Sequence, residues 1–367
     1  MTSIHSYIYS MEESARYATL ADEMMSGSDA IVLSGHCGLK VSNKALHVKR
    51  GPLLGVERED IIYYRGTVPI RTIIMLSRSG NISLDALYWC KEQDISVMML
   101  DGNGDLSFSL SPEGESNAKL RRLQYQAEDV GKAGYIAREL IRLKTLGQIE
   151  VLKTISEYSY KRVFKEYRKR RGAWDKPAWE LLESGLVELS RLKDIGAMLM
   201  CEARLAVIYW DNFVGIPLNW RDSDAKVIAP HWKVITERPS SLSGASARRA
   251  ICPFHAALNY VYGVAEHLLL CSIRASGLDP ACGFLHSDKL HRDSLIYDLI
   301  EPHRAEIDNK VLDFFMQTTL RLGDVILLPS GQIMLNKELC RYLILSCLPD
   351  GKRLRDRVAW IIEQLVN

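Results

Sequence analysis

The sequence lacks any cysteine pattern that indicates a zinc site or a disulfide framework. Its eight cysteines are widely spread, no two of them form a Cys-x-x-Cys pair, and most have apolar neighbours. This pattern is typical of reduced, buried thiols in a cytosolic protein.

Signals for secretion or membrane insertion are also missing from the sequence. The first residues contain no basic region, and Glu12 and Glu13 interrupt any early apolar stretch. No run approaches the roughly 20 apolar residues that a membrane-spanning helix needs. We therefore expect a soluble, cytoplasmic protein.

A strong charge of either sign is the third feature that is absent. The chain has 47 Lys and Arg against 45 Asp and Glu, a formal net charge of +2. This charge is too small to indicate a nucleic-acid partner by itself, so support for DNA binding must come from local clusters. With 367 residues, 47% of them apolar and 25% charged, the chain has the composition of a globular protein with one large or two ordinary domains.

Short β-type runs fill the first third of the chain, after a lead-in of residues 1–29 that is expected to be helical at 9–25. Apolar and β-branched segments alternate with glycine-containing turns between Ala30 and Asp101. The sequence predicts a β-rich domain over residues 30–104, which includes a short helix near 83–93. A cluster of turn-forming residues predicts a linker at 105–117.

The apolar period becomes helical from Ala118 onward. Long helices are expected at 187–214 and 253–276, while prolines and a serine-rich run predict an irregular insertion at 216–247. The predicted class is therefore α+β, with the N-terminal β-rich domain followed by a larger, all-α-helical domain over residues 118–367.

Two carboxylates three residues apart, Asp298 and Glu301, would share one face of a helix that starts near Ser294. Pro302 disfavours helical dihedrals at Glu301, so this carboxylate is expected at a helix end or a kink. Such pairs are common on solvated helix faces. His286 alone is equally compatible with a capping or core histidine.

Glu202 lies in an apolar helical run, where a carboxylate is costly to bury unless a cation or a metal ion pairs with it. Arg204 faces elsewhere, and no other local cation is expected to pair with Glu202. Carboxylates and one imidazole suit Mg²⁺ or Mn²⁺, and the histidine favours Mn²⁺. Such an ion can polarise a phosphodiester.

Two other kinds of site fit the sequence less well. A zinc site would draw on Cys252, His255, Cys282, His286 and His291, but their spacing matches no common zinc pattern. A Ser-His-Asp hydrolase built from Ser294, His286 and Asp298 would lack a nucleophile elbow.

A dense basic run with interleaved aromatic residues offers phosphate neutralisation and base stacking. Its cations are Lys161, Arg162, Lys165, Arg168, Lys169, Arg170 and Arg171. The alternative is a solvated helix end whose cations favour the helix dipole. Arg248 and Arg249 form a second candidate DNA-binding patch.

The ordered motifs of the second half resemble those of the CRISPR-associated integrase of spacer acquisition, the Cas1 family. The chain reads Gly277-Leu-Asp-Pro280, Gly283-Phe-Leu-His286, Ser294-Leu295, Asp298-Leu299, Glu301 and Arg304 in the family's order. Glu202 followed by Tyr209-Trp210 resembles the helix that carries the family's first acidic ligand. The resemblance also includes Asn259-Tyr260-Val-Tyr262, Gln124 and Lys144, and it covers nearly the whole chain from about residue 30.

The resemblance implies a metal-dependent DNA endonuclease/integrase that inserts short spacers into a CRISPR array by transesterification. Glu202, His286 and Glu301 would bind Mn²⁺ or Mg²⁺, and Asp298 would orient His286 or bind through water. The implied partners are double-stranded DNA, a second copy joined through the β-rich domain, and the small ferredoxin-like Cas2 protein. The alternatives are a structure-selective nuclease or transposon-type integrase that uses no array, and a non-catalytic DNA-binding dimer.

Overall fold

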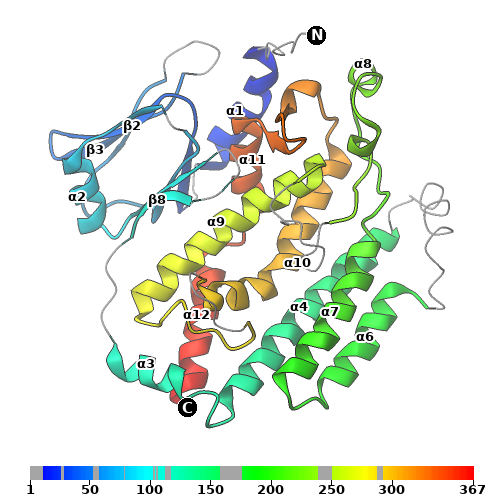
Figure 1. Cartoon of the computed structure of the whole chain (residues 1–367). Coiled ribbons are helices and arrows are strands. Elements are labelled where there is room, and N and C mark those ends of the chain that lie inside the picture. The colour runs from blue at the N-terminus through cyan, green and yellow to red at the C-terminus, as the bar shows by residue number, and fades with distance from the viewer. Residues whose placement is uncertain are drawn as a thin grey trace.

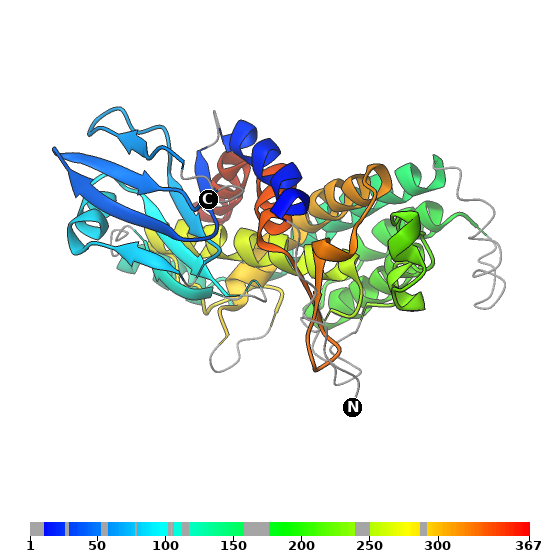
Figure 2. The same ribbon diagram turned by 90° about the horizontal axis from the view of Figure 1, so that it is seen from above.

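The computed structural model describes residues 11–25, 29–52, 58–77, 79–101, 104, 106–111, 117–157, 176–238, 250–286 and 292–367. A strand-rich part lies beside a larger helical part, as Figures 1 and 2 show from two directions. The molecule is therefore of mixed α+β class, as predicted.

The strand-rich part contains two four-stranded sheets. The first has parallel strands β1 (Ala30–Leu33), β5 (Thr72–Met75) and β7 (Ser96–Leu100), with β8 (Leu106–Leu110) antiparallel to β7. The second has the order β4 (Ile61–Tyr63), β3 (Ala45–Lys49), β2 (Cys37–Ser42) and β6 (Gly80–Ile82). Helix α2 (Leu84–Glu92) begins where the Ser83 side chain accepts a hydrogen bond from the backbone N–H of Ala86, and it packs against β2 and β7.

The parallel strands β1, β5 and β7 of the first sheet are buried on both faces, to which their successive side chains point in turn. Ile73 belongs to the core shared with the second sheet, whereas the next residue, Ile74, belongs to the core shared with the helices. Val97 and Met98 divide in the same way. This sheet therefore joins the two parts of the molecule.

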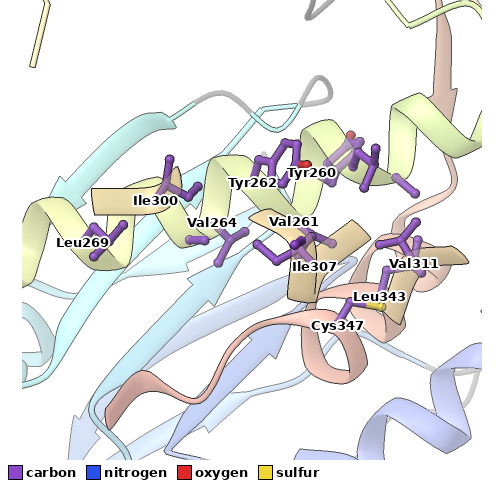
Figure 3. Close-up of a cluster of buried hydrophobic side chains, with 14 of the residues drawn as sticks. Tyr260, Val261, Tyr262, Val264, Leu269, Ile300, Ile307, Val311, Leu343 and Cys347 are labelled. Atoms are coloured by element: carbon purple, nitrogen blue, oxygen red, sulfur yellow. The ribbon is translucent and has the colours of Figure 1, made fainter. Parts of the chain in front are cut away.

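Helices predominate in the described part of the chain outside these two sheets. Helices α4 (Lys132–Glu157), α6 (Ala178–Leu189) and α7 (Ile195–Asp211) lie side by side in Figure 1. Helices α9 (Pro253–Ser276), α10 (Ser294–Gln317) and α11 (Lys337–Cys347) meet in a central apolar cluster that includes Val261, Ile307 and Leu343 (Figure 3). The remaining helices are α1 (Met11–Met25), which packs against α11, and α3 (Ala118–Tyr125), α8 (Asp222–Ala225) and α12 (Gly351–Val366).

Among the described helices, only α9 is long and apolar enough to cross a membrane by length and composition. Most of its apolar stretch is buried inside the protein, against α10, α11 and α12. Packing in the central core therefore accounts for its apolar character.

Three expectations about the elements need correction. The residues predicted as a linker at 105–117 include strand β8, which pairs with β7. The C-terminal region is not all-helical, because β9 (Val325–Leu327) and β10 (Ile333–Leu335) form an antiparallel pair. The single helix predicted at 187–214 is wrong, since α6 ends at Leu189 and α7 begins after Asp194, whose carboxylate accepts a hydrogen bond from the backbone N–H of Ala197 at 2.7 Å.

Of the two places expected for Glu301, a helix end or a kink, the helix end is wrong, because α10 continues through Pro302. The insertion predicted at 216–247 is described only to residue 238. That portion is largely irregular apart from α8 and the short turn Pro230–Trp232.

Candidate active site

Two glutamates from different helices converge on one lysine where α4, α7 and α10 pack together. The Lys144 ammonium on α4 donates a hydrogen bond to Glu202 Oε1 on α7. Its Nζ also lies 2.5 Å from Glu301 Oε2 on α10. The three side chains are only 12%, 19% and 7% exposed, respectively. An ionic cluster therefore lies at the junction of the three helices.

Helical spacing directs Lys144 into this junction. Lys144 follows the buried Leu140 by four residues and precedes the buried Gln148 by four, so it lies on the buried side of α4. Glu202 follows the buried Cys201 on α7. The amphipathic pattern of each helix thus places a charged group at the edge of the core.

Arg304 holds Glu301 from the opposite side. It lies one turn further along α10, and its Nε donates to Glu301 Oε1 at 2.8 Å. The guanidinium also lies 3.9 Å from Glu266 Oε1 and 4.6 Å from the centre of the Tyr262 ring. Three contacts therefore fix the position of Arg304.

The charges around Glu301 keep its carboxylate ionised. Burial by itself raises the pKa of Glu301, but Lys144 and Arg304 outweigh burial and hold the pKa well below the usual value. Burial lowers the pKa of Lys144, yet Glu301 and Glu202 raise it above its ordinary value. Each charged form is thus stabilised by its neighbours.

His286 is oriented by Asp298. The distance between His286 Nδ1 and Asp298 Oδ1 is 2.7 Å. Since an ionised carboxylate only accepts hydrogen bonds, Nδ1 is the nitrogen that donates, and Nε2 is the nitrogen that a neutral ring offers to a metal ion. In its protonated form, His286 is also among the groups that lower the pKa of Glu301, so the imidazole lies near the ionic cluster.

Asp298 also holds the loop that carries His286. Its carboxylate is fully buried and accepts hydrogen bonds from the backbone N–H groups of Phe284, Leu285 and His286, at 2.5, 2.9 and 3.0 Å. Gly283 allows this approach, because a Cβ there would lie 2.9 Å from both Asp298 Oδ2 and Ser294 Cβ. The loop and α10 therefore form one rigid unit around Asp298.

The donor types fit a divalent cation. Two carboxylates and an imidazole with a lone pair on Nε2 are ligands that Mn²⁺ and Mg²⁺ sites use. Within the described residues, however, no three such side chains lie close enough together to hold an ion. Glu202 and Glu301 converge on Lys144 instead. The chemistry fits a metal site, while the arrangement is organised around the lysine.

The structure separates the predicted pair Asp298 and Glu301. Asp298 faces the His286 loop and Glu301 faces Lys144, so the two carboxylates do not converge on a common position. Arg204 pairs with Glu188 and not with Glu202, as expected. The cation that contacts Glu202 is Lys144, 58 residues earlier in the chain. Its place on the buried face of an amphipathic helix is the sequence signal for that pairing.

The residues predicted to bind DNA lie outside the described residues. They are Lys161, Arg162, Lys165, Arg168, Lys169, Arg170, Arg171, Arg248 and Arg249.

Comparison with curated proteins finds relatives over most of the chain. A CRISPR-associated protein Cas1 of Methanobrevibacter ruminantium is 27% identical over 278 residues, which cover 75% of this chain and 76% of the relative. A CRISPR-associated endonuclease Cas1 of Pyrobaculum aerophilum is 27% identical over 270 residues, which cover 72% of this chain and 77% of the relative.

Solved structures share the fold. A casposase bound to its integration product superposes with a TM-score of 0.70 at 23% identity, covering 92% of this chain and 90% of that chain. A chain of a Cas6-RT-Cas1–Cas2 complex gives a TM-score of 0.63 at 15% identity, covering 93% of this chain and 35% of that longer chain. The family model described as CRISPR associated protein Cas1 matches residues 32–346. This chain therefore belongs to the CRISPR-associated Cas1 family.

Proposed function

We propose that the chain is a metal-dependent DNA endonuclease and integrase that inserts short DNA spacers into a CRISPR array. The observation that carries the proposal is the convergence of Glu202 and Glu301, from two helices, beside a histidine oriented by Asp298. Membership of the Cas1 family and the name of the Pyrobaculum aerophilum relative, an endonuclease, support it.

Glu202, Glu301 and Nε2 of His286 would hold Mn²⁺ or Mg²⁺. A bound divalent ion offsets the negative charge that develops on phosphate oxygens during displacement. Arg304 keeps Glu301 in place, and Asp298 fixes both the tautomer and the orientation of His286. In the proposed reaction, a DNA 3′-hydroxyl attacks a phosphodiester at a repeat boundary. A new P–O bond forms as the bond to the leaving 3′-oxygen breaks. The attacking hydroxyl loses its proton to solvent, and the leaving 3′-oxygen takes a proton from solvent to become a new 3′-hydroxyl.

The proposed partners are double-stranded DNA, a second copy of this chain and a Cas2 protein. The second copy would be joined through the β-rich domain. The Cas1–Cas2 complex among the fold relatives supports the Cas2 partnership. The basic run Lys161 to Arg171 and the pair Arg248 and Arg249 are the proposed contacts with DNA phosphates.

A transposon-type integrase or nuclease that uses no CRISPR array is the second candidate. The casposase with its bound integration product supports this alternative, because its fold is similar to that of this chain. The same ligands would serve both reactions. The two candidates differ in the DNA target rather than in the chemistry.

Strand transfer tests the proposal. A short duplex would be joined to a repeat-bearing plasmid in Mn²⁺, and the wild type would be compared with Glu202→Ala and His286→Ala. Glu188→Ala is a matched control, because Glu188 is exposed on the neighbouring helix α6. Joining should fall by about 100-fold or more in both site variants and remain unchanged in the control.

Two outcomes would redirect the assignment. If both site variants join DNA as well as the wild type does, the site is wrong and a non-catalytic DNA-binding dimer is the better description. If a plasmid without repeats is joined equally well, the array-independent alternative replaces spacer insertion.

A further inference from the structure

Lys144 belongs to the ionic cluster but is not one of the proposed metal ligands. Its ammonium touches both Glu202 and Glu301, the two carboxylates that would hold the ion. The oxygen ligands of Mg²⁺ and Ca²⁺ lie about 2.0–2.6 Å from the metal. An ammonium already within 2.5 Å of Glu301 Oε2 would therefore compete with an ion for the same oxygen.

The charges of the cluster determine how strongly it attracts a divalent ion. Glu202 and Glu301 carry two negative charges, and Lys144 and Arg304 carry two positive charges. While the ammonium stays between the carboxylates, these four charges sum to zero, so the cluster attracts a divalent cation only weakly. Once the ammonium leaves, the two carboxylates attract the ion with much less opposition.

Lys144 is also the cation that can move. Arg304 is held by Glu301, Glu266 and the face of the Tyr262 ring. Within the described part of the chain, the Lys144 ammonium contacts the two glutamates, and its four-carbon stem is flexible. Displacement would therefore turn the ammonium outward and leave Arg304 with Glu301.

We infer that Lys144 competes with the divalent ion for Glu202 and Glu301, and that ion binding releases its ammonium to contact a phosphate of the bound DNA. This inference rests on the proposed function. It makes Lys144 a positioning residue that couples the loading of the ion to the binding of the DNA backbone.

The first test measures Mn²⁺ binding in the absence of DNA, by calorimetric titration of the full chain. Lys144→Gln removes the competing charge, so it should bind Mn²⁺ at least about tenfold more tightly than the wild type does. Lys153→Gln is the matched control, because Lys153 is on the same helix but is 44% exposed and paired with Glu150. The control should bind Mn²⁺ as the wild type does.

Thermal unfolding with and without Mn²⁺ provides a second measurement on the same proteins. Without the ammonium, Glu202 and Glu301 repel each other, so Lys144→Gln should melt at a lower temperature than the wild type. Mn²⁺ should raise its melting temperature more than that of the wild type, because the ion replaces the lost charge. A Lys144→Gln protein that does not fold even in Mn²⁺ would contradict the inference.

The third measurement concerns DNA. The measured quantity is the slope of the logarithm of the DNA-binding constant against the logarithm of the salt concentration. In the wild type, Mn²⁺ should steepen this slope by about the amount of one phosphate contact, because the released ammonium displaces one counterion from the DNA. The same addition should leave the salt dependence of Lys144→Gln unchanged. An equal change in both proteins would overturn the release of Lys144 toward DNA.

The failure of the inference is distinguishable from failure of the proposed function. If the wild type binds Mn²⁺ through Glu202 and Lys144→Gln binds it no more tightly, competition is wrong and the proposed function stands. If Glu202→Ala binds Mn²⁺ as well as the wild type does, the proposed metal site is wrong and the inference falls with it.

Discussion

The buried side chain of Asp298 holds both the loop that carries His286 and the imidazole of His286. It accepts hydrogen bonds from three consecutive backbone N–H groups and from the imidazole of His286. A carboxylate suits this position because both of its oxygens only accept hydrogen bonds when ionised. The side chain thus fixes the loop and the histidine together, which links the stability of the fold to the geometry of the site.

We predict that Asp298→Asn reduces both stability and strand transfer. An amide has one accepting oxygen, so its NH₂ group would face backbone donors and leave some of them without a partner. The free energy of unfolding should fall by about 3 kcal/mol in urea denaturation. Strand transfer should fall even at temperatures where the variant remains folded, because His286 loses its orientation.

Asp313→Asn on the same helix is the control. Its side chain is only partly buried, so it should change the unfolding free energy by less than about 0.5 kcal/mol. A stable and fully active Asp298→Asn protein would show that the histidine does not depend on this carboxylate.

At the same scale, the sequence predicts which residues matter better than it predicts their partners. The apolar neighbours of Glu202 indicate that this carboxylate needs a cation. Lys144 comes 58 residues earlier in the chain, however, so its identity as the partner depends on how α4 packs against α7. Similarly, the three-residue spacing of Asp298 and Glu301 cannot show that a loop folds over Asp298 and occupies both of its oxygens.

Among the elements, α1 is attached to the rest of the protein through a buried arginine. Arg341 on α11 is 1% exposed and forms an ion pair with Asp22 on α1. Its Nε donates to the backbone carbonyl of Val32 on β1 at 2.7 Å. Arg58 Nη1 lies 2.8 Å from the same Asp22 carboxylate. Helix α1, strand β1 and helix α11 therefore meet at the ion pair of Arg341 and Asp22.

We predict that Asp22→Ala detaches α1. Among the residues that the structure describes, the substitution leaves Arg341 with Glu338, at 3.6 Å, as its one nearby carboxylate. The loss should be about 3 kcal/mol of unfolding free energy, because an incompletely paired buried charge is costly. Hydrogen exchange should show early deuteration of α1 in this variant.

The neighbouring Glu23 provides the comparison for this prediction. Glu23 is exposed on the same helix, so Glu23→Ala should leave both stability and exchange unchanged. Normal protection of α1 in Asp22→Ala would mean that apolar packing against α11, and not the ion pair, holds the helix.

The sequence predicts well the helices that have a strong apolar period and clear capping residues at their ends. It does not predict a helix boundary that depends on one capping residue, or a strand that depends on pairing with another strand. Helix α9 has the predicted bounds, with Pro253 at its start and the left-handed Gly277 directly after its end. The break between α6 and α7 depends on one capping residue, Asp194, inside a continuous apolar pattern. Strand β8 is stabilised by its pairing with β7, a contact that its turn-rich surroundings do not reveal.

Over the whole molecule, the first sheet contributes residues to both apolar cores. Val32, Ile74, Met98 and Leu100 lie in the same apolar core as the helices. Alternate residues of the same strands lie in the core between the sheets. The composition of the strands predicts burial on both faces, but it does not show that the helical part covers one of them.

We predict a single unfolding transition that involves both parts of the molecule. Ile73 and Ile74 are adjacent, are both fully buried and point into the two different cores. Replacing either isoleucine with alanine should reduce the unfolding free energy by about 2–5 kcal/mol through the cavity that it leaves. Because the sheet is shared, each variant should show one calorimetric transition and reduced exchange protection in both β5 and α9. If Ile73→Ala loosened the strands while α9 kept its full protection, the two parts would be independent domains and the predicted cooperativity would be wrong.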